Sequence, residues 1–153
     1  MVVLFVCTGN TCRSPMAELF LRAELGKRGL PDVTVRSAGL AAFANDTISP
    51  NAAAVMAEHG IDAADFRSTR LSAELALSSD LIFTMSSSHF QSICRALPEC
   101  ASKTAPLLSL VSGGDVPDPY GGDVGVYRKV FSSMVPALLK LVQKIETKEF
   151  NNL

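Results

Sequence analysis

The chain has 153 residues, a formal net charge of −1 and 48% hydrophobic residues. This length favours one domain with a single buried core, and the balanced charge provides no basic surface for nucleic acid or an anionic membrane. No apolar run reaches the ~20 residues that a membrane span needs, and a chain with four cysteines and no export signal is expected to keep free thiols in a reducing cytoplasm.

Strand and helix patterns alternate along the chain. The apolar run Val2–Val6 predicts a strand buried on both faces, and Ser14-Pro15 predicts the cap and first residue of a helix that Gly29 can end. Pro136 should kink the last predicted helix. The remaining strands are predicted over residues 32–39, 80–85 and 103–110, and the remaining helices over 49–59, a short stretch from 72, 86–97 and 123–146.

This alternation predicts an α/β fold in which a single domain contains a parallel sheet with helices on both faces. The domain is expected to span residues 1–148, with a frayed tail over 149–153. Ligands of such sheets bind beyond the carboxyl ends of the strands. Cys7 directly follows the first predicted strand, so the topology places its thiol at the functional edge.

Residues 7–14, CTGNTCRS, combine a thiol with the elements of a phosphate site. Gly9 and Asn10 tolerate the left-handed backbone that lets successive N–H groups converge on an anion. The following helix adds the positive end of its dipole, and Arg13 offers two parallel donors to a phosphoryl group. This positive potential should also favour the thiolate of Cys7, so one loop would make a nucleophile and hold its target. The plainer alternative is an inert cysteine buried at a strand end.

Two motifs stand far apart in the chain. Cys7–Pro15 reads CTGNTCRSP, and Asp118–Gly122 reads DPYGG. Together they resemble the signatures C-x-G-N-x-C-R-S-P and Asp-Pro-Tyr or Asp-Pro-Phe of the low molecular weight protein tyrosine phosphatases, in the order typical of that family. The resemblance covers essentially the whole chain. It implies a fold in which helices flank a four-stranded parallel sheet. It also implies the activity of a cysteine-dependent protein phosphatase.

The resemblance also implies a role for each matching residue. Cys7 would attack phosphorus and form a phosphocysteine. Arg13 and the loop amides would stabilise the transition state, and Asp118 would protonate the leaving group and then activate water. A plainer interpretation of Asp118 and the following proline is a simple turn. The phosphate-binding loop would comprise Thr8, Gly9, Asn10, Thr11, Cys12, Arg13 and Ser14.

Three residues are expected to support this loop. Ser14 would hydrogen-bond the sulfur of Cys7, and Asn10 would hold the loop in shape through its side chain. His59, within EHGI, matches the family histidine that braces this asparagine. A plainer interpretation of His59 is a favourable interaction with the dipole of the helix that ends before Gly60.

The cleft residues carry the question of the substrate. Tyr120 is expected on one wall and the loop around Phe43 on another, although ordinary packing would also explain both. The familiar tyrosine-directed members carry isoleucine where Thr11 stands, and the branch that removes phosphate from arginine carries threonine. The sequence therefore favours phosphoarginine. Phosphotyrosine remains the alternative, because the arginine-directed branch is expected to have phenylalanine where Tyr120 stands.

The remaining cysteines have different expected roles. Cys12 lies near Cys7 in the loop, and family members can join this pair when oxidised, which would protect the nucleophile. Cys94 and Cys100 have no His or Asp pattern for a metal and are interpreted as structural thiols. No metal or organic cofactor is implied. The expected partners are phosphorylated proteins, with phosphate and vanadate as inhibitors, and neither nucleic acid nor membrane; the oligomeric state stays open.

Two rival functions share this fold class. A thioredoxin-coupled arsenate reductase has the Cys-x5-Arg loop but needs a redox cysteine just after the third strand, where Met85 and Ser86 stand here. A phosphocarrier of the sugar-transport type would pass a phosphocysteine to a partner, but such carriers lack the loop arginine and the acid aspartate. Both rivals are therefore disfavoured.

Overall fold

A computed structural model describes residues 1–150 of the chain, and the sheet in it is the predicted parallel one. Its strand order is β2-β1-β3-β4. The bounds are Val2–Cys7 for β1, Thr34–Gly39 for β2, Leu81–Thr84 for β3 and Thr104–Pro106 for β4. Because β1 lies in the middle, its end is flanked by neighbouring strand ends, with Cys7 beside Gly39 and Val6 beside Thr84.

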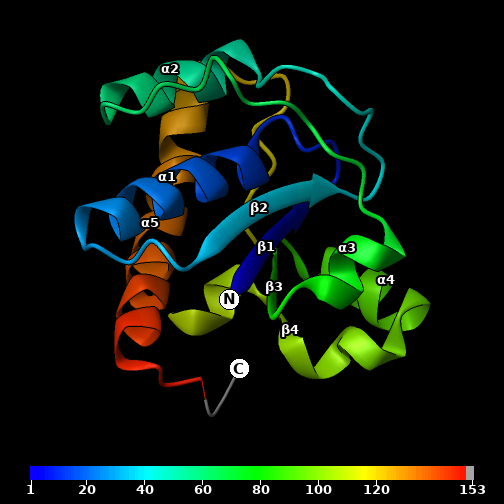
Figure 1. Ribbon diagram of the computed structural model, residues 1–153. Coiled ribbons are helices and arrows are strands. Elements are labelled where there is room, and N and C mark those ends of the chain that lie inside the picture. The colour runs from blue at the N-terminus through cyan, green and yellow to red at the C-terminus, as the bar shows by residue number, and fades with distance from the viewer. Residues whose placement is uncertain (151–153) are drawn as a thin grey trace.

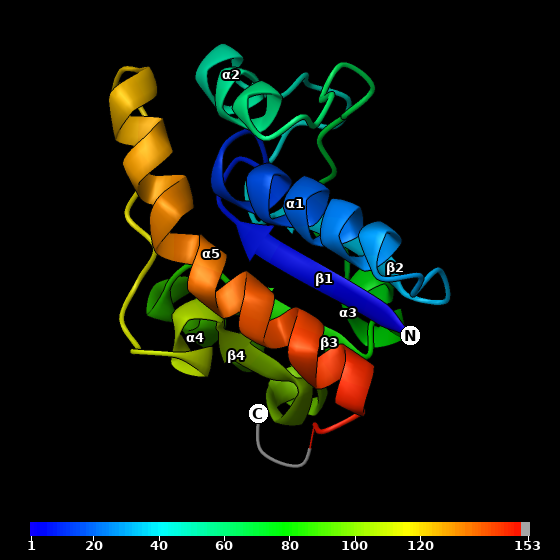
Figure 2. The ribbon, with the colours of Figure 1, turned by 90° about the vertical axis from the view of Figure 1, so that its left-hand side faces the viewer.

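Helices cover both faces of this sheet (Figure 1). On one face lie α1, α2 and α5, and on the other lie α3 and α4, which confirms the predicted α/β architecture (Figures 1 and 2). The helices comprise Arg13–Lys27 in α1, Pro50–Glu58 in α2, Ala73–Ser78 in α3, Ser87–Ala96 in α4 and Val124–Thr147 in α5. Short 3-10 turns span Pro98–Lys103 and Leu107–Leu110.

The side chains of β1 alternate between the two faces of the sheet, which explains why two separate cores form. Side chains of successive strand residues point to opposite faces. Val3 and Phe5 belong to the larger core, which includes side chains of α1 and α5, whereas Leu4 and Val6 belong to the smaller core beside α4. A continuous apolar run is therefore required, and it holds β1 rigidly beneath the loop that follows.

Two local predictions need correction. The helix α1 begins at Arg13 with Cys12 at its N-cap, so Ser14 is not the cap and Pro15 occupies the first turn, where a missing N–H is tolerated. The fourth strand ends at Pro106, and the residues that follow form a 3-10 turn instead of continuing the strand. A proline cannot donate to a strand ladder, which limits β4 to three residues.

The end of the chain is described as far as residue 150. The predicted frayed tail covers 149–153, of which 151–153 lie outside the described residues. Phe150 is described, and it packs against the larger core. The helix α5 continues through Pro136, and its course bends between its yellow and red ends in Figure 2. Among residues 1–150, no helix is both long and apolar enough to cross a membrane.

Candidate active site

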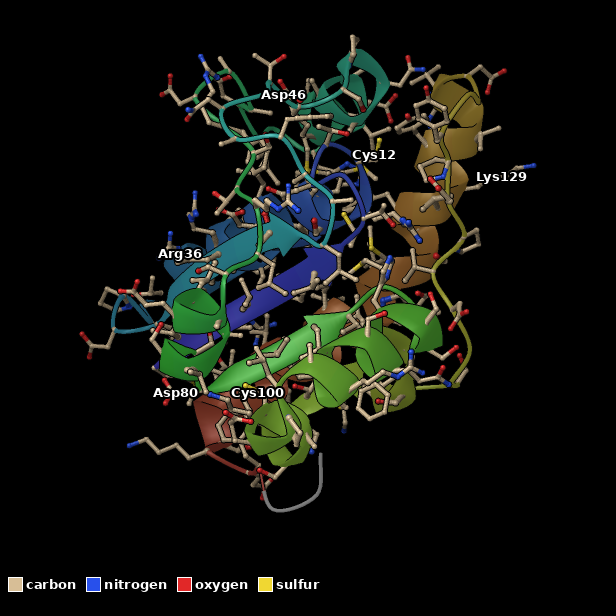
Figure 3. All side chains as sticks on the ribbon, turned by 90° about the vertical axis from the view of Figure 1, so that its right-hand side faces the viewer. Cys12, Arg36, Asp46, Asp80, Cys100 and Lys129 are labelled. Carbon is tan, nitrogen blue, oxygen red and sulfur yellow. The ribbon has the colours of Figure 1, made fainter. Side chains whose placement is uncertain are left out.

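Cys7 is the last residue of β1 and stands at the start of a tight loop between β1 and α1. Figure 3 shows Cys12 in this loop beyond the carboxyl end of the sheet, with Asp80 and Cys100 at the opposite end. Asn10 adopts a left-handed backbone with φ of 55°, which curls the loop back over the strand end. The neighbouring Gly39 has no room for a side chain, because a Cβ there would lie 2.4 Å from the carbonyl oxygen of Thr8.

The Cys7 sulfur is buried and surrounded by donors. The Asn10 backbone N–H donates to it over 3.3 Å, and the Ser14 hydroxyl lies 2.8 Å away. Cys7 itself is 3% exposed. Both groups are placed to donate to the sulfur, so the geometry suits a nucleophile better than an inert buried cysteine.

The side chain of Asn10 fixes the direction of the Ser14 hydrogen bond. Its amide nitrogen donates over 2.8 Å to Ser14 and over 2.8 Å to Ser37, while its amide oxygen accepts from the Thr69 backbone N–H over 2.8 Å. Because Ser14 accepts from this amide, its own hydroxyl hydrogen is available to the sulfur of Cys7. Every polar atom of the buried Asn10 side chain is therefore satisfied.

The network continues inward from Ser37. The Ser37 hydroxyl donates to the carboxylate of Glu18, which also pairs with Arg22. Burial raises the pKa of Glu18, and the hydrogen bond from Ser37 and the charge of Arg22 oppose that rise. The loop between β1 and α1 is thus connected through the side chains of Ser37 and Glu18 to the interior of α1.

Arg13 faces the same pocket and is held from behind. Its Nη1 donates over 3.1 Å to the carbonyl oxygen of Val116, and its Nη2 lies 3.7 Å from a carboxylate oxygen of Asp118. The Asp118 side chain is 59% exposed, whereas that of Arg13 is 8% exposed. A buried cation and an exposed carboxylate therefore meet at the mouth of the loop.

The segment that carries Asp118 is anchored at several points. Val116 donates its backbone N–H to the carbonyl oxygen of Met85 over 2.8 Å, and Asp115 accepts from the Ser87 backbone N–H over 2.8 Å. Further along, Asn51 of α2 donates to the carbonyl oxygen of Gly122 over 3.2 Å. The acid segment is thereby fixed to α4 and α2 instead of projecting freely.

These residues enclose one pocket of about 240 Å³. Tyr120 lines it with a side chain that is 85% exposed, as the sequence predicted for one wall. Phe43, predicted for another wall, is 77% exposed and does not line the pocket. The lining residues are Cys7, Thr8, Gly9, Asn10, Thr11, Cys12, Arg13, Asp118 and Tyr120.

His59 does not lie where the sequence placed it. Its Nδ1 contacts the carbonyl oxygen of Val55 over 2.9 Å, and its ring packs edge-on against Phe20 and Phe131. Within residues 1–150, no hydrogen bond joins His59 to Asn10. The predicted bracing role is therefore wrong, and Ser37 and Thr69 hold the asparagine instead.

Sequence reasoning missed several buried residues that contact the loop, among them Ser37, Tyr127 and His89. The Nε2 of His89 lies 2.8 Å from the hydroxyl of Thr8. His89 stands in the first turn of α4, directly after β3. The only signal was its place beyond the carboxyl end of a neighbouring strand, where ligand-contacting residues gather.

Cys12 is held away from the sheet by polar contacts. Its sulfur lies 3.3 Å from the hydroxyl of Tyr127 and 3.5 Å from that of Ser49. Burial raises the pKa of Tyr127, so this phenol stays protonated near neutral pH. Ser49 also donates its backbone N–H to the carbonyl oxygen of Thr11 over 2.9 Å, which anchors the loop to the start of α2.

All four cysteines are free. Cys100 is fully buried, Cys94 is partly buried, and burial raises the pKa of the Cys94 thiol. Residues 1–150 contain no group of three or more His, Cys, Asp or Glu side chains placed to hold a metal ion. The groups that line the pocket include a thiol, a guanidinium and a carboxylate.

Comparison with known proteins gives consistent matches. Residues 2–151 match the low molecular weight phosphotyrosine protein phosphatase family. A protein-arginine-phosphatase of Geobacillus stearothermophilus is 40% identical over 149 residues, which cover 96% of this chain and 97% of that protein.

Two solved structures extend the comparison. One is a low molecular weight protein tyrosine phosphatase from T. tengcongensis, with a TM-score of 0.89, 40% identity and coverage of 94% of this chain and 99% of that one. The other is YwlE arginine phosphatase, a C7S mutant with a phosphorylated active-site serine. Its TM-score is 0.91, its identity is 35%, and the coverage is 97% of this chain and 98% of that one.

Proposed function

Because the chain belongs to the low molecular weight phosphotyrosine protein phosphatase family, we propose that it hydrolyses phosphoarginine in proteins through a phosphocysteine on Cys7. The family makes it a protein phosphatase, and the residue roles and the substrate are the proposal. The observation that carries it is one pocket in which the hydrogen-bonded Cys7 sulfur lies with Arg13 and Asp118. The serine phosphorylated in the C7S relative supports the choice of nucleophile.

In the first step the Cys7 thiolate attacks phosphorus, and the bond from phosphorus to the leaving group breaks. The loop amides and the Arg13 guanidinium hold the equatorial oxygens, where charge gathers in the transition state. Asp118, at the pocket mouth, donates a proton to the departing atom. For phosphoarginine that atom is a nitrogen, and for phosphotyrosine it is a phenolic oxygen.

In the second step water hydrolyses the phosphocysteine. Asp118, now deprotonated, takes a proton from the attacking water. The Ser14 hydroxyl lies 2.8 Å from the Cys7 sulfur, so it stabilises the thiolate as it leaves. Inorganic phosphate is the product, and we expect phosphate and orthovanadate to inhibit by occupying the same loop.

Thr11 supports phosphoarginine as the substrate. It is half-buried and lines the pocket, where a hydroxyl suits a polar guanidino group better than an apolar side chain does. The relative from G. stearothermophilus, named as an arginine phosphatase, is also 40% identical. Against this stands Tyr120, whose exposed ring lines the pocket and is placed to stack on a phosphotyrosine. The structure from T. tengcongensis, named as a tyrosine phosphatase, is also 40% identical.

The experiment that tests the substrate is a comparison of phosphoarginine and phosphotyrosine peptides at one pH where phosphoarginine survives. The parent should show the higher kcat/KM on phosphoarginine, and Thr11→Ile should reverse the order. The new side chain removes a hydroxyl and adds bulk in the pocket. A lost polar contact or a new clash discriminates by more than the ~1–3 kcal/mol of one methylene.

Thr11→Val is the matched control because it removes the hydroxyl at nearly constant volume. If the hydroxyl decides the preference, Thr11→Val should behave like Thr11→Ile; if bulk decides, it should resemble the parent. A parent that prefers phosphotyrosine, or an unchanged ratio in Thr11→Ile, would leave the tyrosine substrate standing.

Cys12 should protect the nucleophile from oxidation. Peroxide converts the Cys7 thiolate to a sulfenic acid, and the Cys12 thiol then displaces water to form a disulfide. Thiol treatment of the oxidised parent should therefore restore most activity. Cys12→Ser should recover much less, because its sulfenic acid oxidises further. Full recovery of Cys12→Ser, followed with p-nitrophenyl phosphate after a peroxide pulse, would show that Cys12 gives no protection.

The rival functions lack the residues they need. In the structure Met85 follows β3 and is buried, and Cys94 lies far along α4, so no thiol stands where an arsenate reductase would use one. A phosphocarrier has no use for the Arg13 and Asp118 pair. Turnover of p-nitrophenyl phosphate without a protein partner separates the proposed phosphatase from both.

A further inference from the structure

A buried polar cluster lies behind the phosphate loop, on the side away from α1. Its centre is His89, which is 6% exposed. The Nε2 of His89 lies 2.8 Å from the hydroxyl of Thr8, and its Nδ1 lies 2.8 Å from the hydroxyl of Ser86. The imidazole thus bridges the phosphate loop and the turn between β3 and α4.

The ring carries no charge near neutral pH. Burial lowers the pKa of His89, and the nearby Arg13 guanidinium lowers it further, while Asp115 and Asp118 oppose the shift. A neutral imidazole has one N–H donor and one acceptor nitrogen. The partner of one nitrogen therefore decides what the other nitrogen offers.

Ser86 provides an O–H for the Nδ1 side. Its oxygen accepts the His89 backbone N–H over 3.2 Å as the cap of α4. It also lies 3.1 Å from the Ser88 hydroxyl, which can donate to it. With the Ser86 hydrogen directed to Nδ1, the ring hydrogen lies on Nε2. With that hydrogen donated to Thr8, the Thr8 oxygen accepts, and its own hydroxyl hydrogen is released toward the pocket that Thr8 lines.

We propose that His89 is a positioning residue that turns the Thr8 hydroxyl into a donor to the bound phosphoryl group. This inference rests on the proposed function, since a donor at this wall is useful only if the pocket holds an oxyanion. The Thr8 hydroxyl then adds one hydrogen bond to those of the loop amides and Arg13. In the opposite tautomer the Thr8 hydroxyl would donate its hydrogen to the ring. It would then present an oxygen lone pair to the anion, which is unfavourable.

The placement of α4 supports this role. Ser87, next to the cap, donates its backbone N–H to Asp115 of the acid segment over 2.8 Å. The first turn of α4 therefore fixes both sides of the pocket, one through His89 and Thr8 and the other through Asp115.

The test compares Thr8→Val, His89→Leu, the double variant and His89→Gln with the parent. Dissociation constants for inorganic phosphate and orthovanadate are measured by calorimetry, with kcat and KM for p-nitrophenyl phosphate and Tm for each protein. Loss of one hydrogen bond to an anion should weaken oxyanion binding about tenfold in each single variant. The double variant should also lose about tenfold, because both changes remove the same donor. His89→Gln, which keeps an N–H donor, should recover part of the affinity.

Ser88→Ala is the matched control, because Ser88 contacts Ser86 but not Thr8, and its oxyanion affinity should equal that of the parent. Unchanged affinity in Thr8→Val would overturn the proposal, even if His89→Leu merely lowers Tm. Losses that multiply to about a hundredfold in the double variant would show independent effects and overturn it too. A parent that binds vanadate without hydrolysing any phosphoester or phosphoarginine would sink the proposed function only, and the vanadate affinities would still decide the role of His89. A parent that binds neither anion would overturn both.

Discussion

Cys7→Ser should abolish turnover while leaving phosphate binding intact. A serine hydroxyl is a far weaker nucleophile than a thiolate at neutral pH, and loss of a catalytic nucleophile can cost about 10⁴-fold or more in kcat. In the proposed mechanism, in contrast, the loop amides hold the anion together with Arg13, which lines the same pocket. The measurements are turnover of p-nitrophenyl phosphate and the calorimetric affinity for inorganic phosphate.

The network around the sulfur should tolerate this exchange. A serine oxygen at position 7 can still meet the Asn10 N–H and the Ser14 hydroxyl that now surround the sulfur. Cys94→Ser is the control, since Cys94 lies on α4 outside the pocket and should leave kcat unchanged. Substantial turnover by Cys7→Ser would mean that another residue is the nucleophile.

The fold was predictable because its local signals agree with one another. The apolar run of β1, the prolines that open helices and the glycines that close them all follow from backbone chemistry that acts over a few residues. The errors lie where two local rules compete. The fourth strand has a sequence typical of β-structure, but Pro106 has no backbone N–H to donate to a neighbouring strand. The strand therefore ends there.

The site was predictable only along the contiguous motif. Cys7–Ser14 forms one loop whose chemistry is visible in the sequence, whereas the partners of Asn10 come from β2 and from the segment before α3. Ser37 and Thr69 are ordinary polar residues with no pattern that distinguishes them. The contact of Ser37 follows from strand register, which places it beside Phe5 of β1. That of Thr69 follows from the isolated bridge between Gly39 and Arg70. Both pairings join segments that are far apart in the sequence.

The role predicted for His59 was wrong, and the contact of His89 was missed, for the same reason. His59 and His89 both stand at helix ends, and either could reach a loop beyond the sheet. The structure places the ring of His59 among Phe20 and Phe131, and the ring of His89 against Thr8. Which helix end lies beyond the strands depends on how the helices pack, which a single sequence does not specify residue by residue.

Asp118→Ala should lower kcat by about 10²–10⁴-fold on substrates with poor leaving groups, the usual range of general acid–base catalysis. The carboxyl group lies at the pocket mouth, 3.7 Å from the Arg13 guanidinium and largely exposed, so it can reach the departing atom. Phosphopeptides and p-nitrophenyl phosphate should be compared side by side. The acidic nitrophenol leaves without much help from a proton, so the decrease in kcat on p-nitrophenyl phosphate should be smaller.

Asp115→Ala separates acid catalysis from support of the segment. Asp115 accepts from the Ser87 backbone N–H, so its removal should loosen the position of Asp118 without removing the proton donor. The resulting decrease in kcat should therefore be similar for substrates with good and with poor leaving groups. For Asp118→Ala the loss should grow as the leaving group becomes more basic, because the missing proton then matters more. Equal losses on all substrates in both variants would mean that Asp118 shapes the pocket and that the proton comes from elsewhere.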